Sequence, residues 1–199
     1  MSSTTESSDP YLYPGTTVLR NLRDLTDPDR LKRFEARNTH RRIAELVDAP
    51  VSGVFDLSHL KAIHWYIFQD VYEWAGHFRT VNISTSGHLL ALAAFAEPAL
   101  QQALGKLAGE NHLAGLDADR FAARAAYFLG EINAAHPFRE GNGRTQREFI
   151  REVGLKAGHH VDWRSTTAQK MVRASRLSHV SGDSSLFASL IRECIRTGP

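Results

Sequence analysis

A chain of 199 residues with 42% hydrophobic and 23% charged residues has the composition of an ordinary soluble globular protein. This composition excludes collagen-like, coiled-coil and intrinsically disordered proteins. The formal net charge of +2 argues against a protein that mainly binds nucleic acid, so we expect no direct nucleic-acid contact. Cys194 is the only cysteine, which excludes an internal disulfide and a cysteine-based zinc site.

The amino-terminal segment predicts no regular structure. Residues 1–9 are rich in Ser and Thr, which is typical of a disordered tail, and we expect one domain over residues 10–199. The start lacks the apolar stretch of a signal peptide, and no apolar run approaches the roughly 20 residues that span a bilayer. We therefore expect a cytoplasmic protein without membrane contact.

Apolar residues at helical spacing predict a mainly α-helical fold. Asp27 caps a first helix that ends near Ala49, and Asp56 or Ser58 begins a second that ends at Gly76. Further helical patterns follow at residues 97–108, 117–135, 142–157, 165–177 and 184–195.

One segment has the alternation of a strand. Within residues 79–87, Val81 and Ile83 alternate with polar residues, and Thr85, Ser86 and Gly87 have the composition of a turn. We expect a single short β-hairpin here.

Arginine outnumbers lysine by 19 to five, and the arginines gather in two clusters. The first cluster lies on the polar face of the first predicted helix and comprises Arg30, Arg33, Arg37, Arg41 and Arg42. Acidic residues are interleaved with these arginines. We therefore interpret the first cluster as a solvated helix face.

The second cluster lies between two helical patterns, in the sequence HPFREGNGRTQR at residues 136–147. Pro137 ends the preceding helix, and the turn formed by residues 141–143 opens the next one. Backbone N–H groups in such a turn, together with the helix dipole, favour a bound anion such as phosphate. Arg144 and Arg147 are three residues apart, and we expect them to share one face and reach two phosphate groups.

Two further residues in this stretch suit catalysis rather than packing. Glu140 is placed to hold Mg²⁺ that bridges phosphates, and His136 is the one side chain able to accept a proton near neutral pH. Each residue alone has an ordinary structural explanation, but their combination within twelve residues favours a phosphate-handling site. We assign Phe138 to the core, beneath the loop.

This stretch resembles the Fic family motif, His-x-Phe-x-Asp/Glu-Gly-Asn-Gly-Arg-x-x-Arg, at every fixed position. The resemblance extends from about residue 11 to residue 190, and residues 9–15 are similar to the opening of short bacterial Fic toxins. It implies a Fic-type helical bundle with one short β-hairpin flap. It also implies transfer of AMP from ATP to a hydroxyl group of a target protein, with Mg²⁺.

The resemblance implies a role for each motif residue. His136 would be the general base, and Glu140 would hold the Mg²⁺. Five residues would bind the phosphates of ATP: Gly141, Asn142, Gly143, Arg144 and Arg147. Four hairpin residues would form the flap that docks an extended target segment: Val81, Asn82, Ile83 and Ser84.

The inhibitory motif of many Fic proteins, Ser/Thr-x-x-x-Glu-Gly/Asn, is missing from this sequence. Glu110 and Glu140 are the only glutamates followed by Gly or Asn, and Lys106 and His136 stand four residues before them. The resemblance then implies a toxin that is inhibited in trans by a helix of a small antitoxin. By family analogy, the leading targets are bacterial type II topoisomerase subunits, those of DNA gyrase and topoisomerase IV.

Three alternative functions stay open. In a second enzyme hypothesis, the same fold transfers another nucleotide or a phosphate-linked group. The sequence leaves this open because the loop binds phosphates rather than bases. A non-catalytic nucleotide-binding or protein-interaction module is a third hypothesis, although it needs neither a proton acceptor nor a metal ligand. A helical DNA-binding protein is the least favoured, and a steep loss of DNA affinity with salt would be its signature.

Overall fold

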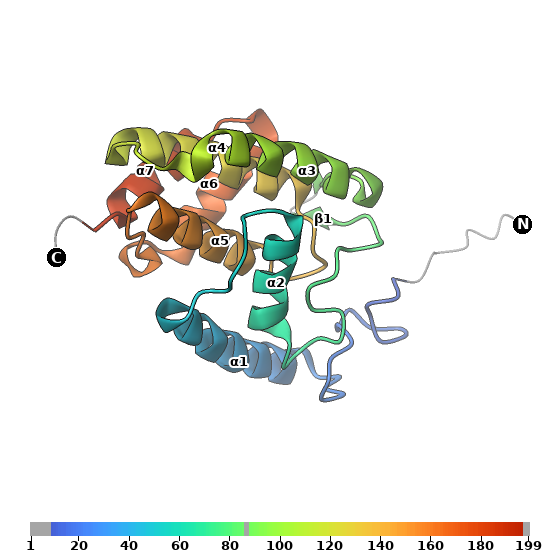
Figure 1. The fold of residues 1–199 in the computed structure, drawn as a ribbon. Coiled ribbons are helices and arrows are strands. Elements are labelled where there is room, and N and C mark those ends of the chain that lie inside the picture. The colour runs from blue at the N-terminus through green and yellow to red at the C-terminus, as the bar shows by residue number, and fades with distance from the viewer. Residues whose placement is uncertain (1–8, 86–87, 197–199) are drawn as a thin grey trace, which may run out of the picture.

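The computed structural model describes residues 9–85 and 88–196, and within them the chain is mainly helical, as predicted (Figure 1). The described residues form seven α-helices: α1 (Pro28–Asp48), α2 (Leu57–Phe68), α3 (Ala93–Gly109), α4 (Ala118–Ala135), α5 (Asn142–Ala157), α6 (Ala168–Ser181) and α7 (Ser185–Cys194). They also form the 3₁₀ turns η1 (Asn111–Leu113) and η2 (Trp163–Ser165), and the strands β1 (Ser84–Thr85) and β2 (His88–Leu89).

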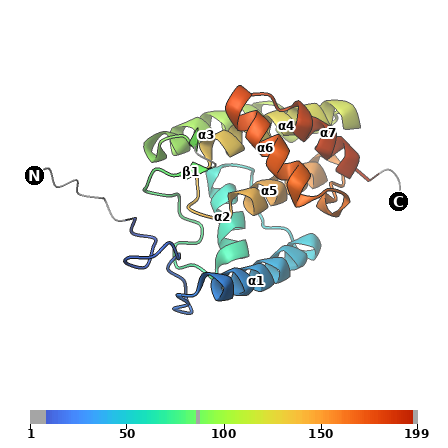
Figure 2. The same ribbon diagram turned by 180° about the vertical axis from the view of Figure 1, so that it is seen from behind.

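Helix α4 is the centre of the bundle. It packs against α3, α5, α6 and α7, while α2 packs against α1 on one side and against α3 and α5 on the other. Figure 1 shows α1 and α2 below the layer formed by α3 and α4, and Figure 2 shows α6 and α7 covering the other side. The loop from α4 to α5, which carries the motif, therefore begins in the middle of the molecule.

Capping side chains explain where the helices begin. Asp27, Asp56 and Asp117 precede α1, α2 and α4, and each carboxylate accepts a hydrogen bond from a backbone N–H in the first turn, at 2.7, 2.8 and 2.9 Å. The predicted starts of these helices are confirmed. Helix α5 ends at Ala157 and is capped by Gly158, whose φ of 86° is a left-handed conformation that favours glycine.

The predicted end of the second helix is wrong. Helix α2 stops at Phe68, and the residues up to Gly76 form turns that fold back against it. The apolar periodicity continues because Val71 and Tyr72 are buried in the same core although the backbone is no longer helical. The turn is held by the Gly76 N–H, which donates to Nδ1 of His64 at 2.8 Å.

The strand positions also differ from the prediction. Val81 and Ile83 lie before the first strand, and the antiparallel pair joins β1 and β2 with Ser84 opposite Leu89. Helix α3 begins at Ala93, upstream of the predicted start, because the Ala93 N–H finds an acceptor in Oδ1 of Asn82 at 2.9 Å. Two predicted turn residues, Ser86 and Gly87, lie outside the described residues.

The core consists of aliphatic and aromatic side chains from all the helices. Fully buried aromatic residues include Tyr72, Phe68, Phe121, Phe128, Phe138, Phe149 and Phe187. Most of the predicted tail lies outside the described residues, but Asp9 forms an ion pair with Arg139 of the motif at 2.8 Å. No helix in the described ranges is long and apolar enough to cross a membrane.

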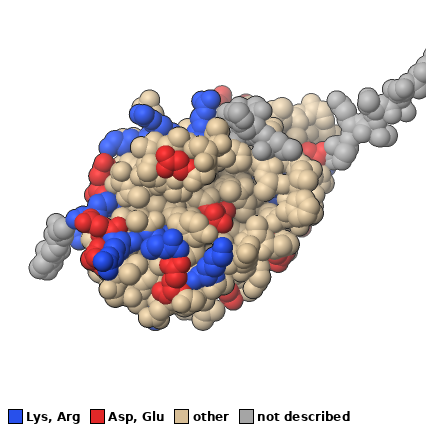
Figure 3. Space-filling view, turned by 90° about the horizontal axis from the view of Figure 1, so that it is seen from above, with Lys and Arg blue, Asp and Glu red and all other residues tan. Residues whose placement is uncertain are grey.

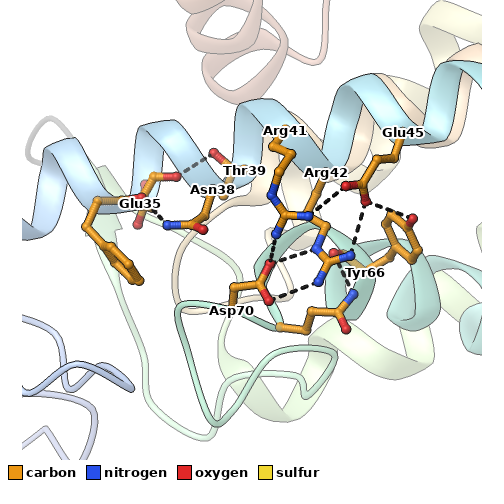
Figure 4. Close-up of polar contacts among 10 residues, drawn as sticks. Glu35, Asn38, Thr39, Arg41, Arg42, Glu45, Tyr66 and Asp70 are labelled. Atoms are coloured by element: carbon orange, nitrogen blue, oxygen red, sulfur yellow. Dashed lines mark hydrogen bonds and ion pairs between the residues drawn. The ribbon is translucent and has the colours of Figure 1, made fainter.

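Basic and acidic side chains are mixed on the surface rather than segregated. Seen from above, Lys and Arg residues alternate with Asp and Glu residues (Figure 3). In the first arginine cluster, Arg41 and Arg42 bind Asp70 at 2.7 Å and also contact Glu45 (Figure 4). These two arginines thus tie α1 to the end of α2 instead of forming a free basic face.

Candidate active site

A cavity of about 480 Å³ lies where the end of α4, the start of α5 and one face of α6 meet. The motif contributes His136, Gly143 and Arg147 to its walls. Helix α6 and the preceding turn contribute residues that include Trp163, Met171, Ser175, Arg176 and His179. The cavity has both apolar and cationic walls, which suits a ligand with an aromatic part and anionic groups.

His136 forms the C-cap of α4 in a left-handed conformation, with φ of 43° and ψ of 60°. Nδ1 of its imidazole is buried without a hydrogen-bond partner among the described residues. Burial, together with the nearby positive charge of Arg79, lowers the pKa of His136 to about 4. The imidazole is therefore neutral at pH 7, which is the protonation state that a general base requires.

Asn142 and Gly141 give the motif loop its shape. The Asn142 side chain donates to the Phe138 carbonyl at 2.8 Å and accepts from the Phe138 N–H at 2.9 Å. Gly141 has a φ of 83°, and a Cβ at this position would lie 2.2 Å from the ring of Phe68. The asparagine side chain thus closes the loop on itself, while the glycine lets it pass over an aromatic ring.

Phe138 anchors the loop in the core, as predicted, and packs against a buried histidine there. Its ring stacks on His64 with centroids 3.8 Å apart and an interplanar angle of 11°. Because Nδ1 of His64 accepts from Gly76, Nε2 carries the proton and donates to the Glu140 carbonyl at 3.1 Å. Burial lowers the pKa of His64 to about 3, so this buried imidazole stays neutral.

Arg144 is directed toward α1. Its guanidinium donates to Oε1 of Glu35 at 2.7 Å and to Oγ1 of Thr39 at 3.1 Å, and it lies 3.3 Å from Oε1 of Glu140. The hydroxyl of Tyr72 donates to the other oxygen of Glu35. A carboxylate on α1 therefore sets the direction of this motif arginine.

Arg147 points into the cavity, away from Arg144. Its guanidinium lies close to Gly143, where a Cβ would be 3.5 Å from Nη1, and its pKa is lowered by burial. The Arg147 carbonyl accepts from the indole N–H of Trp163 at 2.7 Å. The two arginines thus have different neighbours, whereas the sequence predicts one shared face.

The Glu140 side chain has access to solvent, with 44% of its surface exposed. Oε1 accepts the backbone N–H of Gly141 at 2.8 Å. No group of three or more metal-binding side chains occurs in the described part of the chain. A divalent cation here would need ligand oxygens in addition to this carboxylate.

The predicted flap residues precede and enter β1. The side chain of Asn82 caps α3, the carbonyl of Val81 accepts from Arg79, and the carbonyl of Ile83 accepts from Leu90 at 3.1 Å. Ser84 is exposed. Leu90, which follows β2, is buried and lines the cavity. The segment that follows β2 therefore reaches the same cavity as His136.

Several residues around the motif were not predicted as part of the site: Glu35, Thr39, His64, Tyr72 and Arg79. Four of them bind motif atoms that lie 57 to 109 residues away in the sequence, and Tyr72 binds Glu35. In the sequence these residues lie on helix faces or at the start of a loop. No local motif there indicates that they belong to the site. A search for charged or polar residues at core positions would have singled out His64.

A family model described as Fic/DOC family matches residues 54–153, which is half of the chain and includes the whole motif. The chain belongs to the Fic/DOC family. Its mainly helical fold is therefore that of a Fic domain.

Two curated relatives support this membership. The chain is 47% identical over 190 residues to the protein adenylyltransferase VbhT of Bartonella schoenbuchensis, covering 94% of this chain but 39% of that protein. It is 37% identical over 188 residues to the probable protein adenylyltransferase y4lH of Sinorhizobium fredii, covering 94% of this chain and 96% of that protein. The Fic domain thus corresponds to part of one relative and to nearly all of the other.

A solved structure has the same fold. The BepC protein of Bartonella tribocorum with bound AMPPNP matches with a TM-score of 0.90 and 30% identity, covering 95% of this chain and 97% of that one. AMPPNP is an ATP analogue, so BepC, which has the same fold, binds an adenine nucleotide.

Proposed function

We propose that this Fic-domain protein is a nucleotidyltransferase that transfers AMP from ATP to a hydroxyl group of a target protein. The observation that carries the proposal is the neutral imidazole of His136 in one cavity with Arg147 and Gly143. A base and a phosphate-binding group converge there on one space. The names of the curated relatives and the AMPPNP-bound structure support the same activity.

In the proposed reaction, His136 takes the proton of the attacking hydroxyl. The hydroxyl oxygen forms a bond to the α-phosphorus of ATP, the bond from that phosphorus to the α,β-bridging oxygen breaks, and pyrophosphate leaves. The product is a phosphodiester of AMP with a Ser, Thr or Tyr side chain. The low pKa of His136 keeps the proton-accepting form populated at neutral pH.

Phosphate binding is assigned to the amino-terminal end of α5. The first N–H groups of a helix lack intrahelical partners and favour anions, and here they follow Gly141. In the proposal, Gly141, Asn142 and Gly143 surround the α- and β-phosphates, and Arg147 binds the departing pyrophosphate. Arg144, held by Glu35, adds positive charge beside Glu140.

The residues present fit a magnesium ion that is bound together with the nucleotide. Glu140 offers a solvent-accessible carboxylate at the edge of the loop, and Mg²⁺ commonly takes one or two carboxylates plus phosphate oxygens. When bound, the ion would neutralise charge that develops on the phosphates. Glu140 would hold it, and the described residues supply no protein cage for it.

We propose that the target and the inhibitor are separate proteins. A target segment is proposed to pair with the hairpin at residues 81–84 by strand addition. A small antitoxin helix with Ser/Thr-x-x-x-Glu-Gly/Asn is proposed to direct its glutamate to Arg147, which would exclude the γ-phosphate. In that case the chain is a cytoplasmic toxin, with DNA gyrase and topoisomerase IV subunits as the first targets to test.

Two nucleotide labels test the reaction class. The purified chain is incubated with a bacterial lysate, Mg²⁺ and ATP labelled on either the α- or the γ-phosphate. The proposal predicts protein labelling from α-labelled ATP alone, whereas labelling from the γ-phosphate would indicate phosphoryl transfer. Labelled CTP, GTP and UTP in parallel decide whether another nucleotide is the substrate.

Co-expression tests the antitoxin proposal. A helix carrying the inhibitory motif should suppress growth arrest by this chain, and the same helix with its glutamate changed to glycine should bind without suppressing it. Inhibition that survives the loss of the glutamate would overturn the assignment of Arg147 as the inhibitor's contact.

A further inference from the structure

Arg79 lies between the hairpin and the end of α4, with only 3% of its surface exposed. Its guanidinium donates from Nε to the His136 carbonyl at 2.8 Å and from Nη1 to the Val81 carbonyl at 2.7 Å. Nη2 donates to the carbonyls of Ala91 and Ala135. In the described part of the chain, no carboxylate acts on the charge of this guanidinium.

A buried guanidinium that has only neutral acceptors is stable when each of its donors is aligned with a carbonyl oxygen. Burial lowers the pKa of Arg79, yet a guanidinium keeps its charge at every physiological pH. Its planar fork of donors reaches carbonyls in several directions at once, which the compact ammonium group of lysine does not do. The Arg79 side chain therefore links separate backbone segments by hydrogen bonds.

The four carbonyls belong to two parts of the site. Val81 and Ala91 stand at the open end of the hairpin, just beyond the hydrogen bond from Leu90 to Ile83. Ala135 and His136 carry the last carbonyls of α4, which lack partners within the helix and favour a positive charge.

The backbone of Arg79 adds a further link. Its N–H donates to the Pro137 carbonyl at 2.8 Å. Side chain and backbone of one residue therefore bind both ends of the hairpin and the two residues that begin the motif.

We propose that Arg79 is a positioning residue that fixes the hairpin relative to His136, so that a target segment paired with the hairpin presents its hydroxyl to the imidazole. This inference rests on the proposed adenylyl transfer. Arg79 itself does not line the cavity that contains His136. It acts by fixing the position of the hairpin that docks the target relative to the imidazole of His136. A small displacement between the two would lower the rate of transfer strongly.

The charge of Arg79 gives the proposal a second readout. Arg79 and His179 on α6 disfavour the protonated form of His136 in addition to burial. Arg147 on α5 and Arg176 on α6 line the same cavity and add positive charge around it. Removing the charge of Arg79 raises the pKa of His136, so the acid limb of the pH profile moves to higher pH. A residue that only stabilised the fold would leave that limb in place.

Two variants separate geometry from charge. R79K keeps the charge and loses the fork, whereas R79Q loses both. R20K is the matched control, because exposed Arg20 also donates to a carbonyl, that of Leu12 at 2.9 Å, outside the site. We measure adenylyl transfer to the labelled target, the KM for ATP, the pH profile and amide hydrogen exchange.

We expect both Arg79 variants to lower kcat/KM for the target at least about tenfold, with the KM for ATP within about twofold of wild type. Only R79Q should shift the acid limb upward. Hydrogen exchange should rise at residues 81–84 and 90–92 but not in α2 or α5. R20K should behave as wild type in every assay.

Three results would overturn the inference. They are wild-type transfer by R79K, an equal loss of ATP binding and transfer, and a rise of hydrogen exchange throughout the bundle, which would make Arg79 a general fold residue. If the wild-type chain labels no protein, the proposed function fails. The exchange pattern of R79K then still decides whether Arg79 joins the hairpin to the motif loop.

Discussion

Glu35 on α1 and Arg144 at the start of α5 form an ion pair at 2.7 Å across 109 residues of sequence. Both side chains are mostly buried, with 16% and 22% of their surfaces exposed. Arg144 also stacks over Phe68, with its guanidinium carbon 4.7 Å from the ring centroid. The motif arginine is thus oriented by a helix that carries no part of the motif.

Replacing Glu35 with glutamine should weaken ATP binding. The amide keeps the size of the side chain but loses the charge that holds Arg144, and such a charged hydrogen bond contributes about 1 to 2 kcal/mol. We expect the KM for ATP to rise roughly five- to thirtyfold. E45Q is the matched control, because Glu45 lies on the same helix and pairs with Arg41 and Arg42 instead of with Arg144. Equal KM values for both variants would contradict the role of Glu35.

Gly141 should be far less tolerant of alanine than Gly158. Both have a left-handed φ, 83° and 86°, so each alanine variant suffers backbone strain of about 1 kcal/mol. Only at Gly141 does the added Cβ overlap the Phe68 ring, at 2.2 Å, whereas Gly158 faces open space. We expect G141A to lower the free energy of unfolding by at least about 2 kcal/mol more than G158A in urea denaturation. Similar losses would show that the loop moves freely away from Phe68.

The contiguous part of the site could be predicted because the motif is one loop between two helices with strong apolar periodicity. His136, Gly143 and Arg147 do line one cavity. The ends of elements were harder to predict. Val71, Tyr72 and Trp74 continue the apolar spacing of the helix, but residues 69–76 fold as turns that are held by the hydrogen bond from Gly76 to His64. The supporting residues Glu35, His64 and Arg79 could not be found from spacing, because tertiary packing alone brings them to the motif.

The fold should lose stability in mild acid because two buried histidines resist protonation. Burial lowers the pKa of His64 from 6.5 to about 3 and that of His136 to about 4. The unfolded chain therefore binds more protons than the folded chain below pH 6.5, and the stability that is fully present above this pH declines as the pH falls. Each histidine should contribute a loss of up to about 1.4 kcal/mol per pH unit.

Urea denaturation between pH 7.5 and pH 5 measures this decline. H64Q should reduce its slope, because the glutamine amide can still accept from Gly76 and donate to the Glu140 carbonyl but does not titrate. H160Q, at an exposed histidine, is the control and should leave the slope unchanged. A slope that is the same in H64Q and wild type would mean that His64 is protonated in the folded chain.

Proline at position 83 should separate docking from catalysis. The position precedes β1, and proline removes a backbone donor that an added strand would use. We expect I83P to lower target modification much more than self-modification, when each is followed with α-labelled ATP. Equal losses would show that the hairpin serves the fold and not target docking.

The most direct test of the central claim compares wild type with H136A in single-turnover adenylyl transfer to the labelled target. Nucleotide affinity is measured in the same samples by titration with an ATP analogue. Loss of a general base should lower the transfer rate about 100- to 10,000-fold, while analogue affinity and the melting temperature change little. Wild-type transfer by H136A, with intact nucleotide binding, would contradict the assignment of His136 as the base and with it the proposed mechanism.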